Sequence, residues 1–264
     1  MKILITGSSG FIGQNLIPLF DSSYTIRTWD KRNGKDIFSK KLEKEIKECD
    51  IVYHLAAQVS VEKSFKNPFE VFYTNVLGTA RIVQLCVEYG KKLIYPSTVA
   101  VYHKDYSPYS LSKAVAEDIV WGVRGLIPVV ILRLYNVYGK GMNPKSGSIM
   151  YCFLKDKKIV LYGDGEQTRD FINITDIASI LKDTLKKKWN GKIVDVGMGE
   201  ATTINYIAGL FAYFMGKKII YKPVRKEAKW SIANPTLLKT LYKKKLTTDL
   251  EKDIQSLCGP STFL

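Results

Sequence analysis

Residues 1–13, MKILITGSSGFIG, place a glycine-rich turn directly after a short apolar run. Lys2–Thr6 is predicted to be a buried parallel strand, and a helix is predicted to begin at Phe11. Glycines at such a turn let backbone N–H groups approach a pyrophosphate, which then lies at the positive end of the helix. The stretch therefore predicts a dinucleotide site, with a turn that binds nothing as the alternative. The expected cofactor contacts here are Gly7, Gly10, Phe11, Ile12 and Gly13.

A second predicted strand, Tyr24–Trp29, ends at Asp30, which lies seventeen residues after Gly13. A carboxylate at that place accepts hydrogen bonds from an adenosine ribose and repels a 2′-phosphate. Lys31, a further expected cofactor contact, and Arg32 follow, and their positive charges can offset the repulsion. The pattern favours NAD over NADP and leaves NADP open.

The length of 264 residues fits one large domain, or one domain with a small annex. No run of eighteen apolar residues occurs, and the first strand uses the apolar residues at the N-terminus, so neither a membrane span nor a signal peptide is predicted. We therefore expect a cytoplasmic protein that does not bind a membrane. The cysteines lack the spacing of a metal site or a disulfide framework; they are Cys49, Cys86, Cys152 and Cys258.

The formal net charge of +15 requires an explanation, because a basic chain can bind nucleic acid. The lysines occur in short runs such as Lys186–Lys188 and Lys243–Lys245, and none forms a dense basic arm interleaved with aromatic residues. Solvated helix faces explain these runs better than a nucleic-acid site. The positive field still attracts a small diphosphate substrate.

Apolar strand-like runs alternate with helical segments along most of the chain. This alternation predicts an α/β fold, a doubly wound parallel Rossmann sheet. After the first two strands, the runs are Ile51–His54, Lys92–Pro96, Pro128–Arg133 and Lys192–Val196. Turn-rich segments around the last run predict a small C-terminal substrate-binding annex. The expected division is residues 1–136 plus 170–197 for NAD binding, and 137–169 plus 198–264 for substrate binding.

Tyr109 and Lys113 are four residues apart on a predicted helix, which puts their β-carbons about 5–6 Å apart on one face. An ammonium near a phenol favours the phenolate, so we expect the pKa of Tyr109 to lie below its usual value and the phenol to act as a general base. Thr98 follows the strand Lys92–Pro96 and can face the same cleft. An exposed helix pair without a catalytic role is the alternative.

Seven sequence motifs occur in the order found in extended short-chain dehydrogenases/reductases that act on nucleotide sugars. They are TGSSGFIG, HLAAQ, NVLGT, PSTVAVY, YSLSK, LRLYNVYG and GDGEQTRDF. The chain resembles the NAD-dependent epimerase/dehydratase members of that family over nearly its whole length, most of all the UDP-glucose (galactose) 4-epimerases. The resemblance implies a homodimer and a nucleotide-diphosphate sugar substrate, with UDP as the expected nucleotide.

The resemblance assigns catalytic roles to three residues. Thr98 would hydrogen-bond the sugar hydroxyl, Tyr109 would remove its proton, and Lys113 would hold the nicotinamide ribose and lower the pKa of the tyrosine. Hydride would pass from the sugar to a tightly bound NAD, leave a 4-keto sugar, and return to its other face.

The resemblance also assigns binding residues along the chain. Further cofactor contacts are expected at Asp36, Ile37, Leu55, Ala56, Ala57, Asn75 and Tyr135, besides Tyr109 and Lys113. Substrate contacts are expected at Thr98, Asn136, Val160, Tyr162, Arg169 and Arg225, with Lys226 as an alternative to Arg225. For single residues a structural role stays open, notably for Asn75 and Tyr162, and His54 is expected to be a packed strand residue.

Two positions after Thr98 distinguish among relatives. Nucleotide-sugar dehydratases carry Asp-Glu there and the related decarboxylases carry a glutamate at the second position, whereas this chain has Val99 and Ala100. This difference favours epimerisation or reduction of a 4-keto nucleotide sugar; a non-catalytic dinucleotide sensor or nucleic-acid-binding protein is the remaining hypothesis. Only six residues separate Tyr102 from Tyr109, a shorter loop than the epimerases usually carry, which leaves the sugar open.

Overall fold

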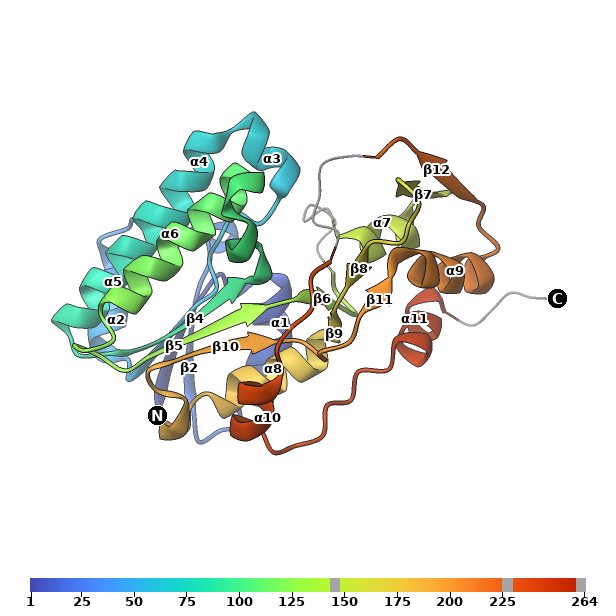
Figure 1. Ribbon diagram of the computed structural model, residues 1–264. Helices are drawn as coiled ribbons and strands as arrows, with labels where there is room; N and C mark the ends of the chain where they lie inside the picture. The colour runs from blue at the N-terminus through green and yellow to red at the C-terminus, as the bar shows by residue number, and fades with distance from the viewer. Residues whose placement is uncertain (143–147, 225–229, 260–264) are drawn as a thin grey trace.

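The computed structural model describes residues 1–142, 148–224 and 230–259, and its centre is a parallel sheet of six strands (Figure 1). The strand order is β10-β5-β4-β3-β1-β2, so the chain runs outward from β1 in both directions. This order confirms the expected Rossmann-like sheet. The strands are β1 (Lys2–Thr6), β2 (Thr25–Trp29), β3 (Ile51–His54), β4 (Lys92–Thr98), β5 (Val129–Leu134) and β10 (Lys192–Val196).

Helices cover both faces of the sheet, because successive side chains of each buried strand point to opposite faces. Leu4 packs with one set of helices, whereas Ile3 and Ile5 pack with the other. The first set is α2 (Lys41–Glu48), α5 (Gly78–Glu88) and α6 (Pro108–Gly122), and the second is α1 (Phe11–Leu16), α8 (Ile174–Asp183) and α10 (Thr236–Leu241).

Strand β4 is two residues longer than the predicted strand Lys92–Pro96, although Pro96 itself has no N–H to donate to the sheet. The ladder continues because β5 extends alongside it and pairs Ser97 with Arg133 and Thr98 with Leu134. Thr98 therefore ends a central strand and caps the 3-10 segment η4 (Val99–Tyr106), which leads into α6.

The helical stretch between Pro68 and Glu88 contains a segment of different geometry. It consists of α4 (Pro68–Phe72), a π-helical segment η3 (Tyr73–Leu77) and α5. The short helix α3 (Val61–Lys66) precedes it. π-Helical turns are uncommon and frequently lie at functional sites.

A smaller part of the molecule lies beyond the carboxyl ends of the strands (Figure 1). Its own apolar cluster includes Met150, Phe153, Phe211 and Ile254. Its elements are β6 (Asn136–Tyr138), α7 (Ile149–Lys155), β7 (Ile159–Tyr162), β8 (Thr168–Arg169), β9 (Phe171–Asn173), β11 (Thr202–Thr203), α9 (Ile204–Met215), β12 (Ile219–Lys222) and α11 (Leu250–Cys258).

Helix α10 does not follow the expected division, which places all of residues 198–264 in the annex. Leu238, Leu241 and Tyr242 are buried in the apolar cluster beneath the large sheet, and α10 contacts β10. Residues 236–242 therefore pack with the core of the large sheet and not with that of the annex. In the described part of the chain no helix is both long and apolar enough to cross a membrane.

Candidate active site

A large cleft of about 1350 Å³ lies at the carboxyl ends of the strands and reaches the annex. Most of the residues expected at the site line it. They are Gly7, Gly10, Phe11, Ile12, Gly13, Asp30, Lys31, Asp36, Ile37, Leu55, Ala56, Ala57, Thr98, Tyr109, Lys113, Tyr135, Asn136, Tyr162 and Arg169. Asn75 and Val160 do not line it, and Arg225 and Lys226 lie outside the described residues.

The glycine turn brings the backbone of β1 against that of the loop after β3. Gly7 has a φ of +67°, and a Cβ there would lie 2.6 Å from the Ala56 nitrogen. A Cβ on Gly13 would lie 2.4 Å from the Ser8 carbonyl oxygen. The turn thus forms a cradle with room for backbone only, and this geometry fits the pyrophosphate of a dinucleotide.

Asp30 is buried at the end of β2, where it faces the turn. Its Oδ2 accepts a hydrogen bond from the Ser9 N–H at 2.9 Å, and its Oδ1 accepts one from the Arg32 N–H at 2.9 Å. Its two carboxylate oxygens keep further lone pairs for ribose hydroxyls. The Arg32 guanidinium lies 3.4 Å from Asp30, so it partly neutralises the carboxylate.

Thr98 and Tyr109 meet in the cleft from two elements, the end of β4 and the first turn of α6. Ser107 caps that turn by accepting from the Ser110 N–H at 3.0 Å, and Pro108 occupies the first helical position. Burial raises the pKa of Tyr109, while the neighbouring Thr98 hydroxyl lowers it. A hydroxyl pair of this kind can hold a sugar hydroxyl and exchange a proton with it.

Lys113 differs from our expectation. Its Nζ donates to the Tyr95 hydroxyl at 2.6 Å and to the Pro96 carbonyl at 3.0 Å rather than to the phenol of Tyr109. The expectation that Lys113 lowers the pKa of Tyr109 is wrong for this structure, because the ammonium is drawn toward β4 and burial of the phenol dominates. Burial also lowers the pKa of Lys113 to about 7, and Glu117 opposes that shift.

Asn75 does not reach the cleft, in contrast to the expected cofactor contact. Its Oδ1 accepts from the Gln58 N–H at 2.8 Å, and its Nδ2 donates to the Gln58 carbonyl at 3.0 Å and to Ser112 Oγ at 2.9 Å. These bonds occupy the amide of this buried side chain. From its place in the π-helical segment, Asn75 therefore joins the cleft-lining loop at Gln58 to α6.

The annex contributes the far wall of the cleft. Tyr162 and Val160 lie on the same face of β7, but only Tyr162 borders the cleft. Arg169 borders it from β8, where it donates to the Thr168 carbonyl at 2.8 Å. The next residue, Asp170, is fully buried and accepts N–H bonds from Met198, Gly199 and Ala233, which anchors this wall.

Comparison with known families accounts for this combination of sheet, cradle and Thr-Tyr-Lys set. The model of the NAD dependent epimerase/dehydratase family matches residues 3–197. The chain belongs to that family. The match confirms the resemblance and the expected cofactor class, NAD.

Curated relatives with different named activities are 32–33% identical to this chain. A Methanocaldococcus jannaschii protein provisionally named a UDP-glucose 4-epimerase is 32% identical over 84% of this chain and 86% of its own length. The human dTDP-D-glucose 4,6-dehydratase is 33% identical over 74% of this chain and 69% of its own. Because these relatives are named as an epimerase and a dehydratase, the reaction of this chain must be assigned from its own residues.

A solved family structure supports the fold over the whole chain. The UDP-glucuronic acid 4-epimerase of Bacillus cereus, in complex with UDP-glucuronic acid and NAD, is 27% identical, with a TM-score of 0.85. The alignment covers 98% of both chains. The annex as well as the sheet therefore matches this epimerase.

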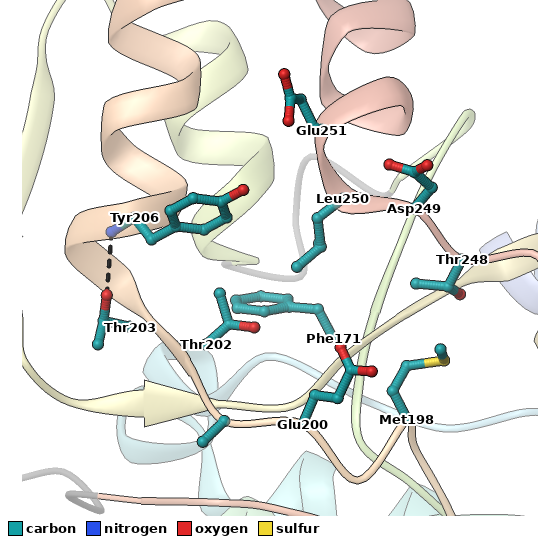
Figure 2. Close-up of a pocket in the computed structure, with 11 residues that line it drawn as sticks. Phe171, Met198, Glu200, Thr202, Thr203, Tyr206, Thr248, Asp249, Leu250 and Glu251 are labelled. Carbon is teal, nitrogen blue, oxygen red and sulfur yellow. Dashed lines mark hydrogen bonds between the residues drawn. The ribbon is translucent and has the colours of Figure 1, made fainter.

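A second, smaller hollow lies on the annex (Figure 2). Phe171 lines both this hollow and the cleft. Carboxylates of Glu200, Asp249 and Glu251 line it, but they do not converge on one point in Figure 2. Among the described residues no group of three or more His, Cys, Asp or Glu could hold a metal ion. The hollow contains no residue that we expected at the site.

Several polar residues behind the catalytic set were missed. Tyr95 resembles any buried residue in the apolar run of β4, so sequence offered no signal for its bond to Lys113. Glu117 lies four residues after Lys113, and this helical spacing could have revealed it. Its partner Arg133 is the charged residue near the end of the apolar strand β5, where a buried ion pair could have been suspected.

Proposed function

We propose that this protein is an NAD-dependent 4-epimerase of a nucleotide-diphosphate sugar, with a UDP-linked hexose as the substrate class. The observation that carries the proposal is the joint placement of Thr98, Tyr109 and Lys113 in one cleft with the glycine cradle. These residues provide both a seat for the cofactor and groups for proton transfer.

Each residue has a specific task in the proposed reaction. Thr98 and Tyr109 hold the sugar hydroxyl, and the phenol takes its proton and later returns it. When bound, NAD supplies a hydride acceptor and a positive charge that favours the phenolate. Arg169 is the cation in the described cleft wall that we assign to the diphosphate, for which a guanidinium is well suited.

Residues 99 and 100 favour epimerisation over loss of water. Elimination needs an additional acid and base near the sugar, and both positions after Thr98 carry aliphatic side chains, Val99 and Ala100. The carboxylates among the described cleft residues are Asp30, Asp36, Glu62 and Glu70, which belong to β2, α3, α4 and their loops rather than to η4. Hydride would then return to either face of the 4-keto sugar, which gives the two epimers.

We further propose a homodimer through α4, η3 and α6. Phe69, Tyr73 and Leu77 follow one another at four-residue spacing, and 77%, 40% and 54% of their surfaces are exposed. Leu111 of α6 adds another exposed apolar side chain. Exposed apolar stripes of this kind mark association surfaces. Sedimentation of the wild type against Phe69→Glu tests this assembly, and a wild-type monomer contradicts it.

The test of the proposed function joins cofactor identification to turnover. Mass spectrometry of the denatured protein should release NAD, and the protein should equilibrate UDP-glucose with UDP-galactose, or their N-acetyl or uronic acid analogues, without added cofactor. Stoichiometric loss of NADH or NADPH with a 4-keto sugar would instead establish the reductase. Absence of interconversion over the whole panel would refute epimerisation.

A further inference from the structure

A buried ion pair joins three elements directly behind the catalytic residues. Glu117 of α6 is 4% exposed, and its Oε2 accepts from Ser97 Oγ at 2.5 Å. Its Oε1 accepts from Arg133 Nε at 2.9 Å and also from Nη2 of the same guanidinium. Ser97 is the neighbour of Thr98 on β4, while Arg133 belongs to β5. One carboxylate therefore links the helix that carries Tyr109 to the strand that carries Thr98.

The network extends to the surface on the β10 side. Arg133 Nη1 donates to the Tyr102 hydroxyl at 2.6 Å, and that hydroxyl donates to Asp195 at 3.0 Å. Tyr102 lies in η4, the segment between Thr98 and α6. Arg133 thus has both a buried and an exposed partner, and the network also fixes the short loop that follows Thr98.

The same carboxylate stands one helical turn from Lys113. Residues four apart on a helix are neighbours on one face, so Tyr109, Lys113 and Glu117 form a row along α6. Lys113 is only 4% exposed. An ammonium at such depth is costly unless negative charge lies close by.

The other groups that face Lys113 are neutral. They are the Tyr95 hydroxyl, the Pro96 carbonyl and His54, a buried imidazole whose pKa is lowered to about 3 and which therefore carries no charge at neutral pH. Facing Glu117 are Arg133, Ser97 and Tyr95. Among the described groups around the ammonium, Glu117 is the one that carries negative charge.

We propose that Glu117 is a positioning residue of the catalytic site: it holds β4 and α6 in register and keeps the Lys113 amine protonated where it lines the cleft. This inference rests on the proposed epimerase function for its kinetic consequence, but not for its effect on the amine. A purely structural ion pair would hold the elements together without influencing Lys113.

Three variants separate these two roles. Glu117→Gln removes the charge at nearly constant volume, and Glu117→Gln combined with Arg133→Gln also removes the unpaired guanidinium. Glu45→Gln is the matched control, because it breaks another strand-to-helix pair, Arg27 with Glu45 at 2.8 Å, away from the cleft. Thermal unfolding of each variant reports the structural part of the role.

The first readout does not depend on activity. Acetic anhydride labelling of the cofactor-free protein over a pH series, followed by peptide mass spectrometry, reports the pKa of the Lys113 amine. In Glu117→Gln that pKa should fall by about one pH unit, as expected on removal of a nearby opposite charge. In Glu45→Gln it should stay at the wild-type value. An unchanged Lys113 pKa in Glu117→Gln overturns the proposal.

The second readout is the pH dependence of kcat on whichever nucleotide sugar the wild type epimerises. In Glu117→Gln the basic limb should move down by about one pH unit, and in the double variant it should stay there although thermal stability recovers. Restoration of both stability and pH profile in the double variant overturns the proposal in favour of a structural pair. If the wild type epimerises nothing, the proposed function fails, while the labelling result still decides the role of Glu117.

Discussion

Replacement of Gly7 by alanine tests the cradle at the point where the chain has least room. Gly7 has a φ of +67°, in the left-handed region that an alanine adopts at a cost of about 1–2 kcal/mol. The new Cβ would also lie 2.6 Å from both the Ala56 nitrogen and the Leu55 carbonyl carbon. These are backbone atoms held by β1, since the Leu55 N–H donates to the Thr6 carbonyl at 3.1 Å.

The steric clash adds to the conformational free-energy cost, because the backbone atoms of Leu55 and Ala56 cannot rotate away as a side chain could. Overpacking of a close-packed region costs about 1–3 kcal/mol, so Gly7→Ala should lose about 2–5 kcal/mol of unfolding free energy. Gly90→Ala is the control, because Gly90 has a φ of +62° and open space at its Cβ position. It should lose only the conformational part, about 1–2 kcal/mol.

Urea unfolding of the two cofactor-free variants measures the difference, and the NAD content of each purified protein measures the functional effect. We expect Gly7→Ala to be less stable than Gly90→Ala by about 1–3 kcal/mol and to release its cofactor. Equal stabilities together with full NAD content in Gly7→Ala would refute the reasoning, because the turn would then have room for a side chain.

Three further substitutions test the site. Tyr109→Phe should reduce kcat by about 10²–10⁴-fold while NAD stays bound, as expected for loss of a general base, and near-normal turnover would contradict its role. Arg169→Ala should raise KM for the nucleotide sugar by about 10–100-fold through loss of charge-assisted hydrogen bonds, and an unchanged KM would place the diphosphate elsewhere. His54 has its pKa lowered by burial to about 3, so the unfolded chain takes up a proton near pH 6.5 that the folded protein does not. Between pH 7 and pH 5 the wild type should therefore lose about 2 kcal/mol of unfolding free energy relative to His54→Gln in urea titrations, whereas an equal response in both proteins would mean that His54 is not buried and neutral.

Much of the fold was predictable because buried parallel strands are continuous apolar runs. Ile51–His54 and Lys192–Val196 were predicted with the observed limits. The glycine cradle was equally predictable, since the need for glycine depends on local backbone geometry. The placement of α10 was not, because Leu238 and Leu241 show only that an apolar face exists and not which core receives it.

In the site, the residues facing the cleft were predictable, but their contacts were not. The helical spacing of Tyr109 and Lys113 correctly put both in the cleft. It could not show that the lysine amine turns toward Tyr95, because that depends on a partner from β4. The predicted cofactor contact of Asn75 was wrong for a related reason. Its amide is hydrogen-bonded to Gln58 and Ser112, which are distant in sequence.

The return of the chain to the sheet at α10 limits how this enzyme can be altered. After β12 the backbone leaves the annex, buries Leu238 and Leu241 beneath β10, and then re-enters the annex as α11, where Ile254 completes its cluster. An annex taken from a relative with another sugar preference cannot be grafted on at one junction, since any exchange that ends before α11 divides a core. Recombination between relatives should therefore succeed only when α10 comes from the same parent as the sheet and α11 comes from the same parent as the annex.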